Sequence, residues 1–198
     1  MLVFWKERLV FLAVPKTGTT AIEGALAPKA ALVLREPPIL KHATVQRCKR
    51  ILHPMMDITK ESDFDTVAVV RNPVDWLGSW YRYRNRDDLV GKPNSTRGRT
   101  FDEFVSAYIS DPQPGFAAVG SQAKFLLAPD GTIGVTHLFR YEARPKLIRF
   151  LEERLSTQIS LNRVNVSPPA DVTLSPGLAK ALLQTCAAEF DVWAAGIA

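Results

Sequence analysis

The stretch Leu9-Val-Phe-Leu-Ala-Val-Pro-Lys-Thr-Gly-Thr-Thr20 decides how this chain folds. Its apolar first half ends at Pro15, a lysine and a Gly/Thr turn follow, and a helical pattern begins after the turn. This order predicts a buried strand that leads through a tight turn into a helix. Because free N–H groups and the positive dipole end at a helix N-terminus attract anions, we expect the turn to bind phosphate or sulfate.

The side chains of this turn fit an anion site. Lys16 supplies a full positive charge, Thr17, Thr19 and Thr20 supply hydroxyl donors, and Gly18 lets the backbone approach a ligand closely. The nucleoside triphosphate loop G-x-x-x-x-G-K-[ST] places its lysine after the second glycine. Since Lys16 precedes Gly18 instead, the pattern disfavours an ATP or GTP site.

A second stretch, Val67-Ala-Val-Val-Arg-Asn-Pro-Val-Asp-Trp-Leu-Gly-Ser-Trp-Tyr81, repeats the strand-to-helix arrangement. Asn72 is a favourable N-cap, and Pro73 suits the first helical position. Arg71 is expected to leave the end of the strand and point into the crevice above the sheet, with Ser79 on the following helix. A guanidinium and a hydroxyl placed in this way could bind one phosphate.

Both stretches resemble one enzyme family. Pro15-Lys-Thr-Gly-Thr-Thr20 resembles the phosphosulfate loop of sulfotransferases that use 3′-phosphoadenosine 5′-phosphosulfate (PAPS). The second stretch is similar to the 3′-phosphate motif of that family, R-x-P-x-D-x-x-x-S-x-Y. Its specified positions are filled by Arg71, Pro73, Asp75, Ser79 and Tyr81. The resemblance implies a P-loop NTPase-like sulfotransferase fold: a single α/β domain over residues 1–198, with a mostly parallel central sheet flanked by helices.

The resemblance also implies the chemistry, which is sulfuryl transfer from PAPS to an acceptor hydroxyl. Lys16 would stabilise the leaving phosphate oxygen. The 5′ side of the donor would lie on Lys16, Thr17, Gly18, Thr19 and Thr20, and the 3′ phosphate on Arg71 and Ser79. No metal is expected, because the lysine and the helix dipole supply positive charge. The expected acceptor is a carbohydrate or glycoconjugate, with no nucleic-acid partner and no membrane insertion.

The general base is expected to be His42, in the segment Lys41-His-Ala-Thr44, because an imidazole titrates near neutral pH. Glu36 is the alternative base, since some relatives use a carboxylate. His53 is expected at a helix end, and His137 is expected to be packed in a strand. The basic C-terminal Arg-Lys-Gly segment of one branch of the family is absent, which leaves the third contact to the 3′ phosphate unassigned.

Composition fits this prediction. A length of 198 residues favours one domain with a sizeable core, and a net charge of +5 favours polyanionic partners. The two cysteines, Cys48 and Cys186, lie in apolar helical patterns and are expected to be reduced thiols, with a disulfide left open. Lys6 and Arg8 before an apolar run mimic a signal peptide. The run is short and continues into the lysine turn, so we expect a cytoplasmic protein.

The remaining pattern predicts further elements of an α/β chain. Strands are expected at 10–14, 31–34 and 66–70, and helices at 19–27, 44–52, 73–84, 101–109 and 145–155. Residues 123–127 and 133–139 flank a turn and suggest a hairpin. A single final helix is expected to start at Ser175. Residues 82–100 are expected to form a mobile loop, whose basic residues (Arg82, Arg84, Arg86, Lys92, Arg97 and Arg99) could steer an anionic acceptor.

Three further segments are weaker candidates. Phe139-Arg-Tyr-Glu142 resembles a downstream segment of the family, where Glu142 is expected to cap or pair. Asn165 and Ser167 resemble a segment near the cofactor, and Ser121-Gln122 could meet substrate or form a plain loop. Two rival functions stay open: a P-loop kinase-like phosphotransferase, and a nucleotide-binding module without turnover.

Overall fold

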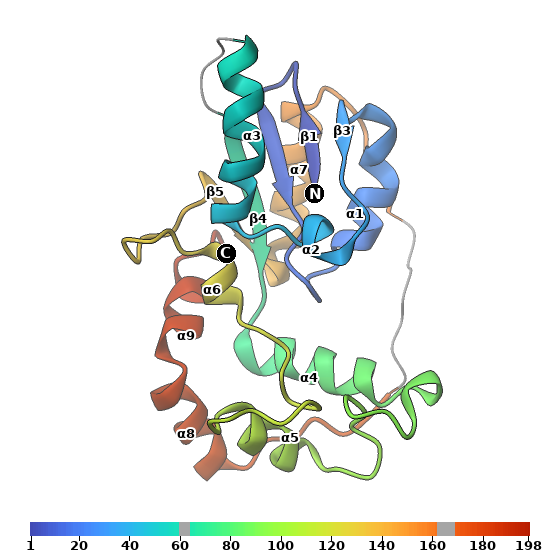
Figure 1. The fold of residues 1–198 in the computed structure, drawn as a ribbon, viewed down its shortest axis with the longest axis vertical. Helices are drawn as coiled ribbons and strands as arrows, with labels where there is room; N and C mark the ends of the chain where they lie inside the picture. The colour runs from blue at the N-terminus through green and yellow to red at the C-terminus, as the bar shows by residue number, and fades with distance from the viewer. Residues whose placement is uncertain (60–63, 162–168) are drawn as a thin grey trace.

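A five-stranded mixed sheet lies at the centre of the molecule. A computed structural model describes residues 1–59, 64–161 and 169–198. Helices pack on both faces of the sheet and beyond one of its ends (Figure 1). The strands are β1 (Leu2–Phe4), β2 (Leu9–Leu12), β3 (Leu32–Val33), β4 (Asp65–Val70) and β5 (His137–Arg140), in the spatial order β3-β1-β2-β4-β5.

The prediction of a mostly parallel sheet is wrong. β4 pairs in parallel with both β2 and β5, but β1 pairs antiparallel with both β2 and β3. The cause is a hairpin at the start of the chain, where the Arg8 N–H donates to the Trp5 carbonyl at 3.2 Å and Arg8 has a φ of 53°. The turn folds the fully apolar Leu2–Phe4 back into the sheet interior, where the strand is buried on both faces.

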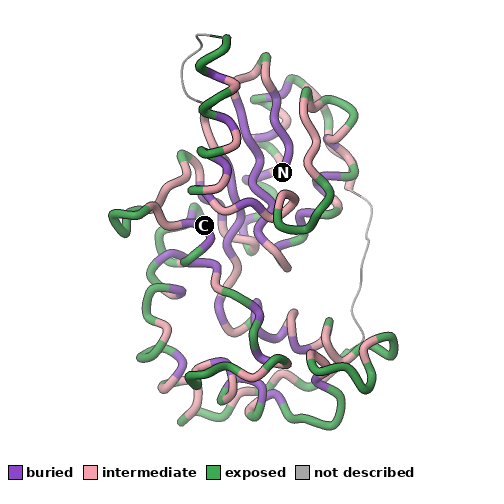
Figure 2. Tube along the Cα trace, in the orientation of Figure 1, coloured by how far each residue is buried: buried purple, intermediate pink, exposed green. Residues whose placement is uncertain are grey.

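The two faces of the sheet are covered by different helices. Helix α3 (Val45–Thr59) covers one face, and its buried residues Val45, Cys48, Leu52 and Met56 recur every three or four positions, as an amphipathic helix requires. Helices α1 (Thr19–Leu26) and α7 (Arg144–Arg154) cover the other face. Figure 2 shows the buried chain concentrated in the strands between these layers.

A second layer of helices lies beyond the carboxyl ends of the parallel strands. It contains α4 (Pro73–Arg84), α5 (Phe101–Tyr108), α8 (Pro176–Thr185) and α9 (Ala187–Ala194), and α4 runs across beneath the end of β4 (Figure 1). The layer has an aromatic core of its own around Trp76, Tyr81 and Phe104. The short helices are α2 (Pro38–Lys41), α6 (Gln122–Leu126), and the 3-10 turns at Ala27–Lys29, Asp87–Leu89 and Tyr141–Ala143.

Three predicted elements differ in the structure, and the first is the helix predicted at 44–52, which extends as α3 to Thr59. The predicted hairpin is replaced by α6 followed by β5, and only one antiparallel bridge, between Leu127 and Ile133, remains of it. The Ser121 hydroxyl caps α6 by accepting from the Lys124 N–H at 2.9 Å, which favours a helix there. The single final helix is divided into α8 and α9 at Cys186, whose φ and ψ are −118° and 37°.

The outer edge of β5 is covered by the last residues of the chain. The Ile197 N–H donates to the Leu138 carbonyl at 2.8 Å, and the Arg140 N–H donates to the Ile197 carbonyl at 2.9 Å. The Arg140 guanidinium also donates to the carbonyls of Trp193 and Ala194 at the end of α9, at 3.0 and 2.5 Å. This arrangement ties the second layer of helices to the sheet.

Candidate functional site

The two predicted anion-binding segments emerge at the same edge of the sheet. β2 and β4 are neighbouring parallel strands, with Leu12 opposite Ala68. The turn that contains Lys16 follows β2, and Arg71 follows β4 directly. Since ligands of α/β sheets bind beyond the carboxyl ends of the strands, this edge is the candidate site.

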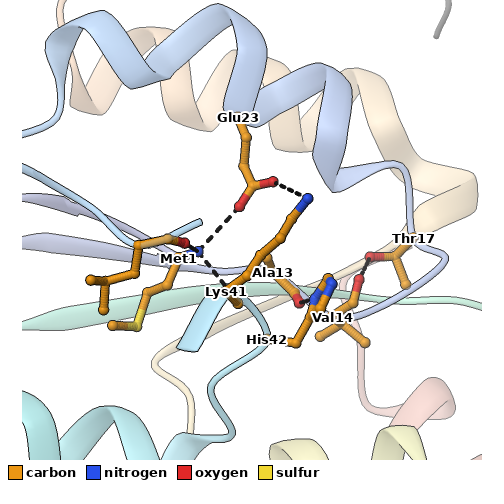
Figure 3. Close-up of polar contacts among 8 residues, drawn as sticks. Met1, Ala13, Val14, Thr17, Glu23, Lys41 and His42 are labelled. Carbon is orange, nitrogen blue, oxygen red and sulfur yellow. Dashed lines mark hydrogen bonds and ion pairs between the residues drawn. The ribbon is translucent and has the colours of Figure 1, made fainter. Parts of the chain in front are cut away.

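The Lys16 turn has an unusual backbone. Lys16 and Gly18 have positive φ values of 65° and 76°, and Gly18 is the N-cap of α1 without a side-chain cap. The first N–H groups of α1 are therefore left without the side-chain acceptor that commonly caps a helix. Thr17 is buried and its hydroxyl donates to the Val14 carbonyl at 2.9 Å, so in this conformation it shapes the turn (Figure 3).

The other two threonines of the turn differ in exposure. Thr19 is buried at the first position of α1, whereas Thr20, the next residue, is exposed. Gly18 itself is exposed, but a Cβ at this position would lie 3.1 Å from Cε2 of Tyr141. Thr20 and the backbone at Gly18 are the parts of the turn most open to a ligand.

Helix α4 holds the Lys16 turn from the other layer. The indole Nε1 of Trp76 donates to the Pro15 carbonyl at 2.9 Å. The Lys16 ammonium lies 3.9 Å from the ring centroid of Tyr83 and 5.4 Å from that of Trp80, which are cation–π distances. One face of α4 therefore fixes both the backbone and the charged end of the lysine.

Arg71 is held at the start of α4 by its backbone and its side chain. Its N–H donates to Gln122 Oε1 at 2.9 Å, and its carbonyl accepts from Gln122 Nε2 at 3.0 Å. Its guanidinium lies 4.6 Å from the ring centroid of Tyr141, the residue that also contacts Gly18. The buried Nε of Arg71 has no hydrogen-bond partner in the described part of the chain, which leaves a donor available for a ligand.

The start of α4 is capped as predicted. The Asn72 side chain accepts from the N–H groups of Val74 and Asp75, at 3.0 and 3.4 Å, and Pro73 occupies the first helical position. Glu142 accepts from the Asn72 N–H at 3.0 Å and from the Trp193 indole at 3.2 Å. The capping role expected for Glu142 is confirmed, and its carboxylate links Asn72 to α9.

Ser79 lies on α4 in the same helix as the aromatic residues that contact Lys16. Its side chain is half-buried, and over residues 1–59, 64–161 and 169–198 its hydroxyl has no hydrogen-bond partner. The Ser79 hydroxyl and Nε of Arg71 therefore make no hydrogen bond within the described protein that would compete with a bound phosphate.

Arg82 is a further member of the site that sequence reasoning placed only in the basic loop. Its Nη1 lies 3.6 Å from the position of a Cβ on Gly78, so the side chain folds back along α4 toward the helix start. Burial and the nearby positive charge of Arg71 lower the pKa of Arg82. Arg82 follows Ser79 by three residues, about one helical turn, and this spacing was the sequence indication that the two side chains share a face of α4.

The charges around Lys16 are positive, whereas the carboxylates of Asp75 and Glu142 act on Arg82 and Arg71 without forming an ion pair with them. Burial, followed by the charges of Arg86, Arg71 and Arg82, lowers the pKa of Lys16 to about 8. Within the described ranges, Lys16, Arg71 and Arg82 form no ion pair with a carboxylate. Like charges held close together around Lys16, with no carboxylate paired to it, favour the binding of an anion.

His42, at the end of α2, lies beside the chain segment that leads into the Lys16 turn. Its Nδ1 donates to the Ala13 carbonyl at 2.7 Å, as Figure 3 shows, and this leaves Nε2 as the ring's proton acceptor. Burial lowers the pKa of His42, against the opposing effect of the Ala13 hydrogen bond, so the neutral imidazole prevails at pH 7. The preceding Lys41 pairs with Glu23 of α1 at 3.3 Å, and Glu23 also accepts from the Met1 amino group at 3.1 Å.

The other candidate bases lie elsewhere. Glu36 is exposed in the loop before α2. His53 is exposed within α3, and its predicted place at a helix end is wrong because the helix continues past Pro54 to Thr59. The His137 ring packs on Phe150, with centroids 4.6 Å apart, in agreement with its predicted packing role. Asn165 and Ser167 lie outside the described residues.

Several basic residues of the predicted loop make contacts within the protein. Arg84 donates to the carbonyls of Gly115 and Ala118, at 2.8 and 2.9 Å. Arg97 pairs with Asp87, and the Arg99 guanidinium lies 3.9 Å from the ring centroid of Phe116. Of this set, Arg82 and Arg86 are the residues whose charges act on Lys16. The mobility of residues 82–100 stays a prediction.

Ser121 and Gln122 belong to a buried polar cluster that sequence reasoning did not find. Glu189 of α9 accepts from the Ser121 hydroxyl and from the N–H groups of Gln122 and Ala123, at 3.1 and 3.3 Å for the two N–H groups. Burial raises the pKa of Glu189 despite these bonds. Gln122 is fully buried, so it supports Arg71 and does not meet substrate itself.

Three further observations concern the described residues. Cys48 is buried, Cys186 is half-buried, and both are free thiols. No group of three or more His, Cys, Asp or Glu side chains in ranges 1–59, 64–161 and 169–198 is placed to hold a metal ion. None of the helices seen there combines the length and the apolar composition that a membrane span needs.

Comparisons with protein-family models, curated proteins and solved structures give no match to this chain. The assignment to a family therefore stays a prediction that depends on the two sequence motifs and on the site described above.

Proposed function

We propose that the protein is a PAPS-dependent sulfotransferase that transfers the sulfuryl group to an acceptor hydroxyl. One observation carries the proposal. Lys16 and Arg71 follow two adjacent parallel strands, and both cations lack a carboxylate partner among residues 1–59, 64–161 and 169–198. A donor with anionic groups at two ends of a nucleoside fits a site whose cations come from two neighbouring segments. The family's P-loop NTPase-like fold is part of this proposal.

The donor would lie along α4. Its 5′ phosphosulfate would bind the uncapped N–H groups of α1 and Lys16, and its 3′ phosphate would bind Arg71 and Ser79. We assign to Arg82 the third phosphate contact, because its guanidinium folds back toward the start of α4. The donor's negative charges would offset the repulsion among these cations.

The transfer step uses groups whose protonation suits it. The acceptor oxygen attacks sulfur in line, a new O–S bond forms, and the S–O bond to the 5′ phosphate breaks. The acceptor proton moves to Nε2 of His42, which is free because Nδ1 carries the hydrogen bond to Ala13. Protonated Lys16 stabilises the negative charge that develops on the leaving phosphate oxygen. A carbohydrate or glycoconjugate is the proposed acceptor, on the resemblance of the motifs.

The first test is calorimetric binding of 3′-phosphoadenosine 5′-phosphate (PAP), with ATP–Mg²⁺ as the rival ligand. We expect PAP to bind in preference to ATP–Mg²⁺, and Arg71→Ala to weaken PAP about 10- to 150-fold, the usual value of a charged hydrogen bond. Arg50→Ala is the matched control, because Arg50 is exposed on α3, away from this edge. Absent PAP binding, or a preference for ATP–Mg²⁺, overturns the proposal in favour of the kinase-like function.

The second test separates an enzyme from a binding module. Labelled PAPS is offered with a panel of hydroxylated saccharides and phenols, and transfer of label is measured for wild type and Lys16→Met. We expect transfer to one acceptor class and its loss in Lys16→Met. PAP binding without transfer to any acceptor would instead support the non-catalytic module.

A further inference from the structure

The ammonium of Lys16 is surrounded by positive charge. Arg71 approaches from the end of β4, Arg82 from α4, and Arg86 from the segment after α4, and each of them disfavours the protonated lysine. No carboxylate among the described residues acts on Lys16 itself. Arg86 pairs with Asp88 at 3.4 Å, and its guanidinium lies 5.2 Å from the ring centroid of Tyr83. A flexible lysine in such surroundings would be expected to turn toward water, so another contact must hold it in place.

That contact is aromatic. The Lys16 Nζ lies 3.9 Å from the centroid of the Tyr83 ring and 5.4 Å from that of Trp80. The two rings meet edge to face, with centroids 5.8 Å apart and an interplanar angle of 84°. The negative face of each ring attracts a cation, and the attraction strengthens where water is partly excluded.

The aromatic residues form one stripe on α4. Trp76, Trp80 and Tyr83 recur at spacings of four and three residues, so they share a face of the helix. Trp76 donates to the Pro15 carbonyl at one end of the stripe, and Tyr83 contacts the Lys16 ammonium at the other. Tyr83 is 36% exposed, so its side chain can be changed with little effect on the core.

We infer that Tyr83 is a positioning residue, whose ring keeps the Lys16 ammonium charged and fixed against α4. The role of this contact toward a sulfuryl donor rests on the proposed function. Because the ring face makes the contact, the phenol hydroxyl is not needed, and phenylalanine should replace tyrosine. Leucine fills similar space but offers no π-system to the cation, so it should favour the neutral lysine.

The experiment measures the protonation of Lys16 directly. The protein is labelled with a limiting amount of acetic anhydride between pH 6 and 10, and acetylation of the Lys16 peptide is followed by mass spectrometry. We expect a midpoint near 8 in the wild type, an unchanged midpoint in Tyr83→Phe, and a lower one in Tyr83→Leu. Coincident curves for all three proteins would overturn the inference, and so would a Tyr83→Phe midpoint as low as that of Tyr83→Leu.

A second measurement connects the contact to the donor. PAP affinity is measured over the same pH range for these proteins and for Lys16→Arg, which cannot lose its charge. We expect wild-type affinity to fall as pH rises through about 8 and to stay level in Lys16→Arg. At pH 8, Tyr83→Leu should bind PAP about 2- to 30-fold more weakly than wild type, the value of a cation–π contact.

The two measurements separate two kinds of failure. If PAP binds and requires Arg71, but the labelling midpoints coincide, the proposed function stands and the role of Tyr83 is overturned. If labelling shows the expected shift but PAP does not bind, the aromatic contact stands while the proposed function and the donor-binding role of Tyr83 fail. If Tyr83→Leu weakens PAP equally at every pH, Tyr83 supports structure only and the inference is overturned.

Discussion

Gln122 and Arg71 are joined by two hydrogen bonds between the amide side chain of the first and the backbone of the second. The Arg71 N–H donates to Oε1 at 2.9 Å, and Nε2 donates to the Arg71 carbonyl at 3.0 Å. The amide thus continues the hydrogen bonding of β4 past its last residue. It sets the point at which the Arg71 side chain leaves the sheet, from a position 51 residues later in the chain.

Replacing Gln122 by leucine should destabilise the fold and disturb the site. The change leaves the N–H and the carbonyl of the half-buried Arg71 unpaired, at a cost of about 2–4 kcal/mol in the free energy of unfolding. Urea unfolding at pH 7 measures it, with Gln46→Leu on the exposed face of α3 as the control. An unchanged unfolding midpoint for Gln122→Leu would contradict the structural role of the amide.

Two glycines of α1 and its cap should respond in opposite directions to alanine. At Gly18 the φ of 76° and the ring of Tyr141, 3.1 Å from the new Cβ, both oppose a side chain. We expect Gly18→Ala to lower the free energy of unfolding by about 1–2 kcal/mol. Gly24 lies within α1 with no atom within 4 Å of a Cβ, and Gly24→Ala should stabilise by about 0.5–1 kcal/mol.

Thermal unfolding of these two variants is the measurement. A loss of stability in both would mean that the α1 region tolerates no added methyl group, and that the contact between Gly18 and Tyr141 is not the specific cause. A gain in both would contradict the backbone conformation at Gly18.

His42→Asn should separate binding from transfer. The asparagine amide can donate to the Ala13 carbonyl in place of Nδ1, but it offers no basic nitrogen to an acceptor hydroxyl. We expect PAP affinity near that of wild type and sulfuryl transfer slower by about 100- to 10,000-fold, the usual contribution of a general base. His53→Asn, at an exposed position on α3, is the control. Undiminished transfer in His42→Asn would exclude His42 as the base and turn attention to Glu36.

The buried carboxyl of Glu189 should make stability depend on pH. Burial raises the pKa of Glu189 in the folded protein, so the folded state binds its proton more tightly than the unfolded state does. The contribution of Glu189 to the free energy of unfolding is therefore complete below its ordinary pKa of 4.5. It is lost as the pH rises through the pKa of the folded state. Glu189→Gln removes the titration and should gain on the wild type as pH rises.

Urea unfolding from pH 4 to pH 8 gives this difference directly. The free energy of Glu189→Gln minus that of wild type should increase across the range, whereas the same difference for Glu153→Gln, exposed on α7, should stay level. A difference that falls with pH would show that the three hydrogen bonds to Glu189 outweigh its burial.

Local patterns predicted much of the site because the relevant forces act over a few residues. The caps of α4 and the backbone of the Lys16 turn depend on near neighbours, so Asn72, Pro73 and Gly18 could be assigned from sequence. The order of strand, turn and helix likewise placed Lys16 and Arg71 at one edge of the sheet. The bounds of α4 agree with the predicted 73–84.

The errors came from contacts between distant residues. β1 is only three residues long, and its pairing between β2 and β3 depends on long-range partners that a single apolar run does not reveal. The turn at Pro129-Asp-Gly131 suggested a strand on either side, but residues 122–126 form α6, which is supported by Glu189, more than 60 residues away. The roles of Arg82 and Tyr83 could not be predicted, because the sequence does not show which face of α4 lies against the Lys16 turn.

The cover on β5 has a consequence for self-association. An open strand edge is a template on which a second chain can pair, and proteins avoid aggregation by blocking it. Here Ile197 occupies the hydrogen-bonding groups of Leu138 and Arg140, and the Arg140 guanidinium anchors the preceding carbonyls of α9. Loss of the Ile197 contacts would leave the Leu138 carbonyl and the Arg140 N–H open for pairing, so variants that loosen the residues after α9 should self-associate more readily than the wild type.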